Sequence, residues 1–408
     1  MNRLVQLILI VYGYEGLILN LVPPSIFRIA LEMIILVSAL FIMNTSVKSS
    51  IRFNRYWTLL LLAVILVTIC SGLFNSSSVW STVSFLRYFI LFFLGFILGS
   101  QVKKSWYFKS ILATIIVSQP LAAIIKLILI GPSEDYIGTI SISAGSLATT
   151  FTLLVIGYLF IEYRISGKFH WLLGILIFSV VAYAGDKRVY WFIAPLSIFV
   201  LDSIIRRTRL KFSQIIILVL SLSTSIYVGA RMLPSLNSSH KFWGEWDSEY
   251  LSDYVLSYTN GSSDEGLGVG RIGSQIAMYE NLNSGANIRK YFGTGPDTFI
   301  DKSNVDGVQK EFGVYLLSHF TGVMFYMGSI GFIGSILYLL FLCSSLRLSL
   351  KLRYVNDRIS LFLTHTYIVM IWDYLFYTKS LQNYQGIIFF SSLLLGYLVS
   401  KKYAYTVR

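Results

Sequence analysis

Long apolar runs, separated by short polar turns, recur from one end of the chain to the other. Each run is close to the roughly 20 residues that an α-helix needs to cross a hydrocarbon core about 30 Å thick. The runs predict twelve transmembrane helices, at residues 4–22, 26–43, 57–73, 84–100, 108–130, 142–162, 169–185, 189–205, 212–230, 320–346, 359–378 and 386–400. No small-residue cleavage site follows the first run, so we expect a retained helix there and not a signal peptide.

The composition supports this interpretation. Hydrophobic residues make up 55% of the 408 residues and charged residues 13%, and the mean hydropathy is +0.68. Soluble domains carry roughly 25% charged residues, which excludes an ordinary soluble enzyme. We therefore expect an all-α polytopic membrane protein.

Lysine and arginine predict the orientation, because they resist translocation and collect in cytoplasmic loops. With a cytoplasmic N-terminus, the inward segments hold 20 of the 33 cations, while short outward loops such as residues 75–78 and 131–141 are neutral or acidic. The two kinds of loop alternate through all twelve spans, so both termini are expected in the cytoplasm. The net charge of +13 is then explained by topology, and no nucleic-acid partner is expected.

One outward segment is far longer than the other loops. Residues 231–312 hold 11 of the 20 acidic residues of the chain but only 7 basic ones. Loops of this length in a compact protein are usually functional. We therefore divide the chain into helices 1–9 (residues 1–230), a periplasmic loop domain (231–312) and helices 10–12 (313–408).

A short helix is predicted inside this loop. Ile272, Ile276, Tyr279 and Leu282 repeat at helical spacing, and Gly285 follows as a stop signal. A glycine-rich stretch at residues 260–270 precedes it and is expected to act as a hinge. A tight turn is expected after it, at residues 291–297.

Cations on the outward side are unexpected and require an explanation. Lys187 and Arg188 join two predicted spans that are too short for a full hydrocarbon core, so their turn is expected below the outer surface, facing a polar cavity. Arg87 is similarly placed, 16 residues from Lys103 at the inner edge. Two simpler interpretations stay open: Arg87 extends to lipid headgroups, and Arg188 pairs with Asp186.

Clustered guanidinium groups suit a phosphate ligand, because they bind it bidentately and stay charged. A lipid-linked diphosphate at the outer face would supply such an anion. Arg271, in the first turn of the loop helix, lies where backbone N–H groups also favour anions. Arg289 and Lys290 are expected at the end of that helix, where they either close over the ligand or compensate the helix C-terminus.

Two side chains are candidates for a general base. His319 lies near the outer end of an apolar stretch, and histidine accepts a proton readily near neutral pH. Asp373, near the outer end of its predicted span, is the second candidate. The sequence contains no GxxxxGK[ST] or GxGxxG nucleotide motif and no cysteine, histidine or carboxylate cluster suited to a metal, so no cofactor and no metal are expected.

The order of these features resembles a known family. A basic turn (GDKRVY, 185–190) is followed by a long loop with a helix that begins with arginine (RIGSQIAMY, 271–279), then by FGTGPDTF (292–299), His319, and glycines 328, 331 and 334. Bacterial Wzy-type O-antigen polymerases and the related O-antigen ligases have this order. Phe320 stands where an asparagine is common in the family, and the identity of the base therefore stays open between His319 and Asp373.

The resemblance implies a metal-independent C-type glycosyltransferase of the inner membrane, involved in lipopolysaccharide biosynthesis. Such an enzyme moves a growing glycan from undecaprenyl diphosphate onto the terminal sugar of a second lipid-linked repeat unit. By resemblance, Arg188 and Arg271 bind the diphosphate and His319 belongs to the last external motif. A Wzz-type chain-length regulator is an implied partner.

Two other functions are possible from the sequence alone. An O-antigen ligase would pass the finished polymer to lipid A-core. A twelve-helix flippase for the lipid-linked unit would place its binding residues near the bilayer midplane, whereas here the polar features collect at the outer rim and in the loop.

Overall fold

The computed structural model describes residues 2–19, 22–45, 55–130, 145–185, 187–207, 212–260, 271–285, 287–300, 321–378 and 384–406. Within these ranges the chain is helical, without a β-strand. A helix lies in each of the twelve segments predicted to be spans. These helices are α1 (Asn2–Gly13) with α2 (Glu15–Ile18), α3 (Pro24–Thr45), α4 (Arg55–Phe74), α5 (Val79–Ser100), α6 (Trp106–Ile130), α7 (Gly145–Ser166), α8 (His170–Ala184), α9 (Arg188–Arg206), α10 (Phe212–Met232), α16 (Gly322–Lys351), α17 (Asp357–Trp372) with a π-helical turn (Asp373–Tyr377), and α19 (Gln385–Thr406).

Among the described residues, eight helices are long and apolar enough to cross a membrane: α4, α5, α6, α7, α9, α10, α16, and α17 together with its π-helical turn. Large apolar side chains on their flanks are exposed, among them Leu66, Val117, Leu129 and Ile217. An apolar outer surface on long helices is what a hydrocarbon solvent favours. The described residues are thus all helical and include eight helices suited to cross a membrane, as the expected class requires. The number of twelve spans stays a prediction.

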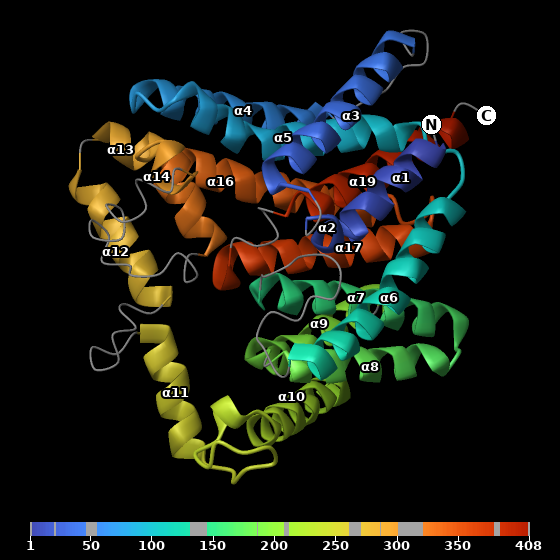
Figure 1. The fold of residues 1–408 in the computed structure, drawn as a ribbon, viewed down its shortest axis with the longest axis vertical. Helices are drawn as coiled ribbons and strands as arrows, with labels where there is room; N and C mark the ends of the chain where they lie inside the picture. The colour runs from blue at the N-terminus through green and yellow to red at the C-terminus, as the bar shows by residue number, and fades with distance from the viewer. Residues whose placement is uncertain are drawn as a thin grey trace.

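The long segment between α10 and α16 contains several short helices. These are η1 (Pro234–Leu236), α11 (Ser248–Asn260), α12 (Arg271–Ser284), α13 (Asn287–Phe292) and α14 (Asp297–Ile300). In Figure 1, α11 and α12 run along the left end of the bundle, and both termini lie on the right. We call these two ends the loop end and the terminal end.

The closest helix pair in the bundle is α5 with α19, and glycines make this contact possible. A Cβ on Gly99 would lie 1.9 Å from the carbonyl oxygen of Leu393, and one on Gly396 would lie 2.0 Å from that of Phe96. Small residues at such positions let two backbones approach within a membrane. The pair α5 and α19 therefore forms a rigid centre for the upper part of the bundle in Figure 1.

Aromatic side chains fill the space between α5, α16 and α17. The rings of Tyr326 and Tyr338 stack with their centroids 4.2 Å apart, and both contact the ring of Tyr374 edge-on. The Tyr374 hydroxyl lies 2.6 Å from the Ser335 hydroxyl, so the polar tip of this buried ring is satisfied. This cluster packs the N-terminal part of α16 against the π-helical turn that carries Asp373.

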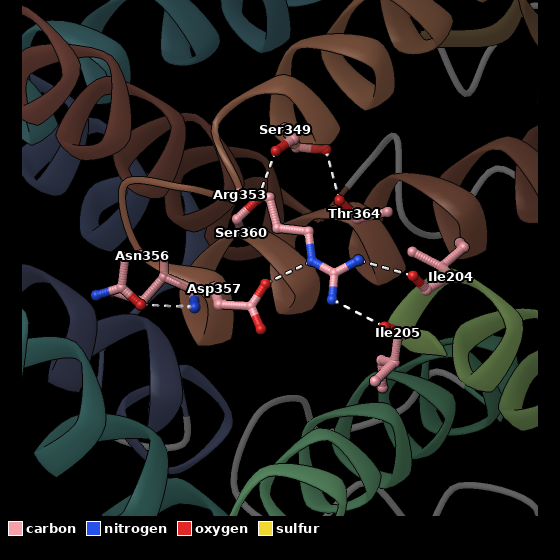
Figure 2. Close-up of polar contacts among 9 residues, drawn as sticks. Ile204, Ile205, Ser349, Arg353, Asn356, Asp357, Ser360 and Thr364 are labelled. Carbon is pink, nitrogen blue, oxygen red and sulfur yellow. Dashed lines mark hydrogen bonds and ion pairs between the residues drawn. The ribbon is translucent and has the colours of Figure 1, made fainter. Parts of the chain in front are cut away.

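At the terminal end, Arg353 ties the turn between α16 and α17 to the end of α9 (Figure 2). Its two terminal nitrogens donate to the carbonyl oxygens of Ile204 and Ile205 over 2.7 and 3.1 Å, and its Nε donates to Asp357. The last carbonyls of a helix have no partner inside the helix, and a guanidinium satisfies two of them at once. Arg353 is thus a structural residue that joins two parts of the bundle.

Replacing Arg353 by alanine is expected to destabilise the protein by about 2–3 kcal/mol, because charge-assisted hydrogen bonds contribute about 1.5–3 kcal/mol. The thermal unfolding midpoint of the detergent-purified protein measures this loss. Lys351→Ala is the matched control, since Lys351 is an exposed cation in the last turn of α16. Equal midpoints for the two variants would show that the contacts in Figure 2 contribute nothing.

Candidate functional site

The basic turn between α8 and α9 lies at the loop end. Lys187 is the N-cap of α9 and is only 6% exposed, and its backbone N–H donates to the carbonyl of Ala182. Arg188 is the first residue of α9. Asp186, considered as a local partner of Arg188, lies outside the described residues.

Arg188 contacts the long segment between α10 and α16. Its Nη1 donates a hydrogen bond to the hydroxyl of Tyr254 in α11, and its guanidinium carbon lies 5.4 Å from the centre of the same ring. The ring and the hydroxyl together restrict the orientation of the guanidinium plane. The structure thereby brings α11 over the basic turn, 66 residues away in sequence.

The sequence analysis predicted only one helix in this segment and missed α11. A signal for it exists: the Asp247 side chain accepts a hydrogen bond from the backbone N–H of Tyr250 over 2.9 Å, as an N-cap does. Leu251 then forms the buried face of α11 against Ala230, Leu233 and Leu236. An aspartate followed by an apolar residue at helical spacing could therefore have indicated the start of α11.

The predicted loop helix corresponds to α12, and Arg271 begins it as expected. Its buried face differs from the prediction, because Ser274, Met278 and Leu282 are buried, whereas Ile276 and Tyr279 are about half exposed. The apolar residues counted in the sequence thus lie on two different faces of α12. The face that packs against the bundle includes small Ser274, which allows close approach.

Gln275 attaches α12 to the bundle. Its side-chain amide donates to the Thr321 hydroxyl over 3.1 Å and to the carbonyl of Leu375 over 3.4 Å. Thr321 is the N-cap of α16, and Leu375 lies in the π-helical turn after α17. One side chain of the long segment between α10 and α16 thereby contacts the start of α16 and the end of α17.

Asp373 lies in that π-helical turn and is completely buried. Its Oδ1 accepts a hydrogen bond from the Thr378 hydroxyl over 2.9 Å. His319 lies outside the described residues, as do the glycine-rich hinge at 261–270 and the side chain of Arg271. The predicted convergence of Arg188, Arg271 and His319 therefore stays a prediction, whereas the contact of Arg188 with α11 is observed.

Arg289 and Lys290 lie in α13, a helix separate from α12. The Lys290 ammonium donates to the Asn283 side-chain carbonyl over 2.7 Å. The 14 residues of α12 extend about 21 Å from Arg271, and these two cations follow its end in the sequence. In Figure 1, α13 lies beside α4 and α16, whereas α11 lies on the side of α10. Arg289 and Lys290 of α13 are therefore separated by α12 from Arg188, which contacts α11.

Two motifs that are far apart in the sequence meet at α16. Gly331 breaks this helix, with φ of 70° and ψ of −174°. The freed carbonyl of Gly328 accepts hydrogen bonds from the backbone N–H and the hydroxyl of Thr294, over 2.7 and 3.0 Å. Backbone from the FGTGPDTF motif thus occupies the break, which explains why both segments are rich in glycine.

The same motif also contacts α4 and α5. The Ser71 hydroxyl lies 2.5 Å from the carbonyl oxygen of Phe292 and 2.8 Å from that of Ser329. The Asp297 carboxylate accepts hydrogen bonds from the N–H and hydroxyl of Ser78 over 2.7 and 3.1 Å, at the start of α5. The segment 291–297 was predicted as a tight turn, and its contacts attach the long segment between α10 and α16 to α4 and α5.

Arg87 belongs to a separate network between α3, α5 and α19. Its Nε lies 3.3 Å from Glu32 Oε1, which also accepts a 2.7 Å hydrogen bond from Gln385, and Arg28 Nε lies 3.1 Å from Glu15 Oε1. Each of these cations has a carboxylate partner within the bundle. Arg87 thus pairs with Glu32, and its contact with a lipid headgroup or a substrate stays a prediction.

No group of histidine, cysteine and carboxylate side chains that could hold a metal occurs in the part of the chain that the structure describes. No protein-family model matches this sequence, and no curated protein matches it. The site is therefore defined by its geometry: a basic turn that contacts α11, with α12 attached through Gln275 to the start of α16 and to the π-helical turn that carries Asp373.

Proposed function

We propose that this protein is a Wzy-type O-antigen polymerase, a metal-independent C-type glycosyltransferase of the bacterial inner membrane. It transfers a growing glycan from undecaprenyl diphosphate to the terminal sugar of another lipid-linked repeat unit. In this proposal twelve helices cross the membrane, both termini are cytoplasmic and residues 231–312 face the periplasm. A Wzz-type chain-length regulator is its expected partner.

The contact between Arg188 and Tyr254 is the observation that carries the proposal. It supports a role for the basic turn together with the long segment, since an arginine held by a ring and a hydroxyl is oriented in advance for an anion. Arg188 begins α9, and the N–H groups of a helix N-terminus favour the same anion. A diphosphate presented from the outer leaflet matches this combination.

The chemistry needs no external energy source, because the diphosphate already activates the anomeric carbon. In the reaction the hydroxyl oxygen of the acceptor sugar forms a bond to that carbon, and the bond between the carbon and the diphosphate oxygen breaks. Arg188 and Arg271 stabilise the negative charge that develops on the leaving diphosphate. A base takes the proton from the attacking hydroxyl.

We assign His319 as that base. Asp373, the alternative, has no exposed surface in this conformation and is bonded to Thr378, so an incoming sugar hydroxyl does not reach it. Asp373 instead supports the turn to which Gln275 attaches α12. His319 precedes Thr321, the second partner of Gln275, by two residues in the sequence.

Deletion of the gene tests the proposed function in the host cell. Loss of a polymerase is expected to leave single repeat units attached to lipid A-core, visible as a one-unit band on a lipopolysaccharide gel. Loss of a ligase would leave core without any repeat unit, and loss of a flippase would prevent the lipid-linked unit from reaching the periplasm. Either of the last two outcomes would refute the polymerase assignment.

A further inference from the structure

A groove runs along the lower part of the bundle, between α7, α8, α9 and α10. It has a volume of about 480 Å³, and its walls include Ile175, Ile198 and Ile217. Both Tyr190 and Arg206 of α9 line it, and sixteen residues of helix between them correspond to about 24 Å. The groove is thus long enough for an acyl chain, which occupies about half of a 30 Å hydrocarbon core.

The groove is polar and charged where it reaches the terminal end of the bundle. There it is lined by Arg164, Asp202 and Arg206. Asp202 lies between the two arginines, with Oδ1 3.1 Å from Arg164 Nε and Oδ2 2.6 Å from Arg206 Nε. One carboxylate therefore serves two guanidinium groups, and the cluster keeps a net positive charge.

The positive side chains of this cluster are also more exposed than the negative one. The side chains of Arg164 and Arg206 are 30% and 44% exposed, whereas that of Asp202 is 19% exposed. Arg207 follows as an exposed cation in the C-cap of α9. In the predicted topology this end faces the cytoplasm, where basic pockets between helices bind anionic lipid headgroups.

Arg353 keeps the groove end in place without contributing to its charge. It donates to the carbonyls of Ile204 and Ile205, and Asp357 balances its charge (Figure 2). The end of α9 is therefore fixed, and the positions of Asp202 and Arg206 are fixed with it. At the groove end Arg164, Arg206 and Arg207 are positive and Asp202 is negative, which leaves an excess of positive charge.

We propose that this groove binds one anionic phospholipid of the inner leaflet, with its phosphate between Arg164 and Arg206 and an acyl chain along Ile198 and Ile217. The guanidinium groups contact Asp202 through their Nε atoms, and the phosphate takes the remaining N–H groups in bidentate fashion. The bound lipid fills the space between α10 and α9. This site lies at the opposite end of the bundle from Arg188.

Native mass spectrometry of the full-length, delipidated protein with added phosphatidylglycerol measures this binding. Arg206→Gln and Arg164→Gln are each expected to lower the retained lipid about fivefold, the effect of one cation near an anionic headgroup. Lys168→Gln, which removes an exposed cation at the same end of the bundle, is expected to change nothing. Phosphatidylcholine is expected to bind weakly to every form.

Asp202→Asn separates binding from misfolding, because it removes the internal competitor for the two guanidiniums. It is expected to raise phosphatidylglycerol retention, opposite in sign to the arginine variants. A decrease in Asp202→Asn, or an equal decrease in Lys168→Gln, would overturn the proposal. Full displacement of the lipid by excess inorganic phosphate would show a site for a free anion and would also overturn it.

Discussion

An Arg188→Lys variant is expected to make almost no long-chain glycan. Lysine keeps the positive charge but loses the planar guanidinium, which packs over the Tyr254 ring and which, in the proposed function, holds the diphosphate bidentately. Removal of one oriented donor from a transition-state site lowers the rate about 100- to 1000-fold. Lipopolysaccharide gels of a deletion strain that carries the variant measure the chain length, with the amount of protein in the membrane checked in parallel.

Two further variants separate the causes of this loss. Arg207→Lys makes the same change at the other end of α9 and is expected to leave the chain length unchanged. Tyr254→Phe keeps the ring and removes the hydroxyl that accepts the Arg188 hydrogen bond, so a smaller reduction than in Arg188→Lys is expected. Normal long chains from Arg188→Lys would contradict bidentate recognition at this residue.

A Gly331→Ala variant is expected to have the largest effect on stability. A Cβ at Gly331 would lie 2.2 Å from the carbonyl oxygen of Tyr291, within the break of α16. A positive φ with ψ near 180° is a region occupied essentially by glycine alone and costs another residue about 1–3 kcal/mol, and the clash adds about 1–3 kcal/mol. The protein is expected to unfold at a clearly lower temperature in detergent and to lose polymerising activity, because the FGTGPDTF segment can no longer occupy the break.

Gly167→Ala is the matched control for this variant. Gly167 also has a positive φ, of 69°, but no atom lies within 4 Å of a Cβ added there. The control therefore keeps the cost of the backbone angle without the clash. If Gly331→Ala and Gly167→Ala lowered the unfolding temperature equally, the close contact between Tyr291 and α16 would have no structural importance.

The helices could be predicted from the sequence because each long apolar run needs a helix to satisfy its backbone in hydrocarbon. In Figure 1 the long segment between α10 and α16 and the two termini lie at opposite ends of the bundle, and the side of the membrane that each end faces stays a prediction. The predicted helices depend on local composition alone, and the structure places helices in the corresponding segments.

The contacts within the candidate site could not be predicted in the same way. The partner of Arg188 is Tyr254, in the helix α11 that the sequence analysis did not predict, and the partner of Arg87 is Glu32 in a different helix. The glycines at 328 and 331 were noted, but nothing local to them shows that residues 292–294 occupy the break. Such pairs depend on how distant helices pack, which a single sequence does not encode in its local pattern.

The central claim is tested most directly with the purified protein in detergent and the purified undecaprenyl-diphosphate-linked repeat unit, without nucleotide, added metal or a membrane potential. We expect ladders of elongated lipid-linked glycan on a gel, and no elongation with Arg188→Lys. If the active preparation left every repeat unit unelongated while transferring it to added lipid A-core, the protein would be a ligase and the polymerase assignment would be wrong.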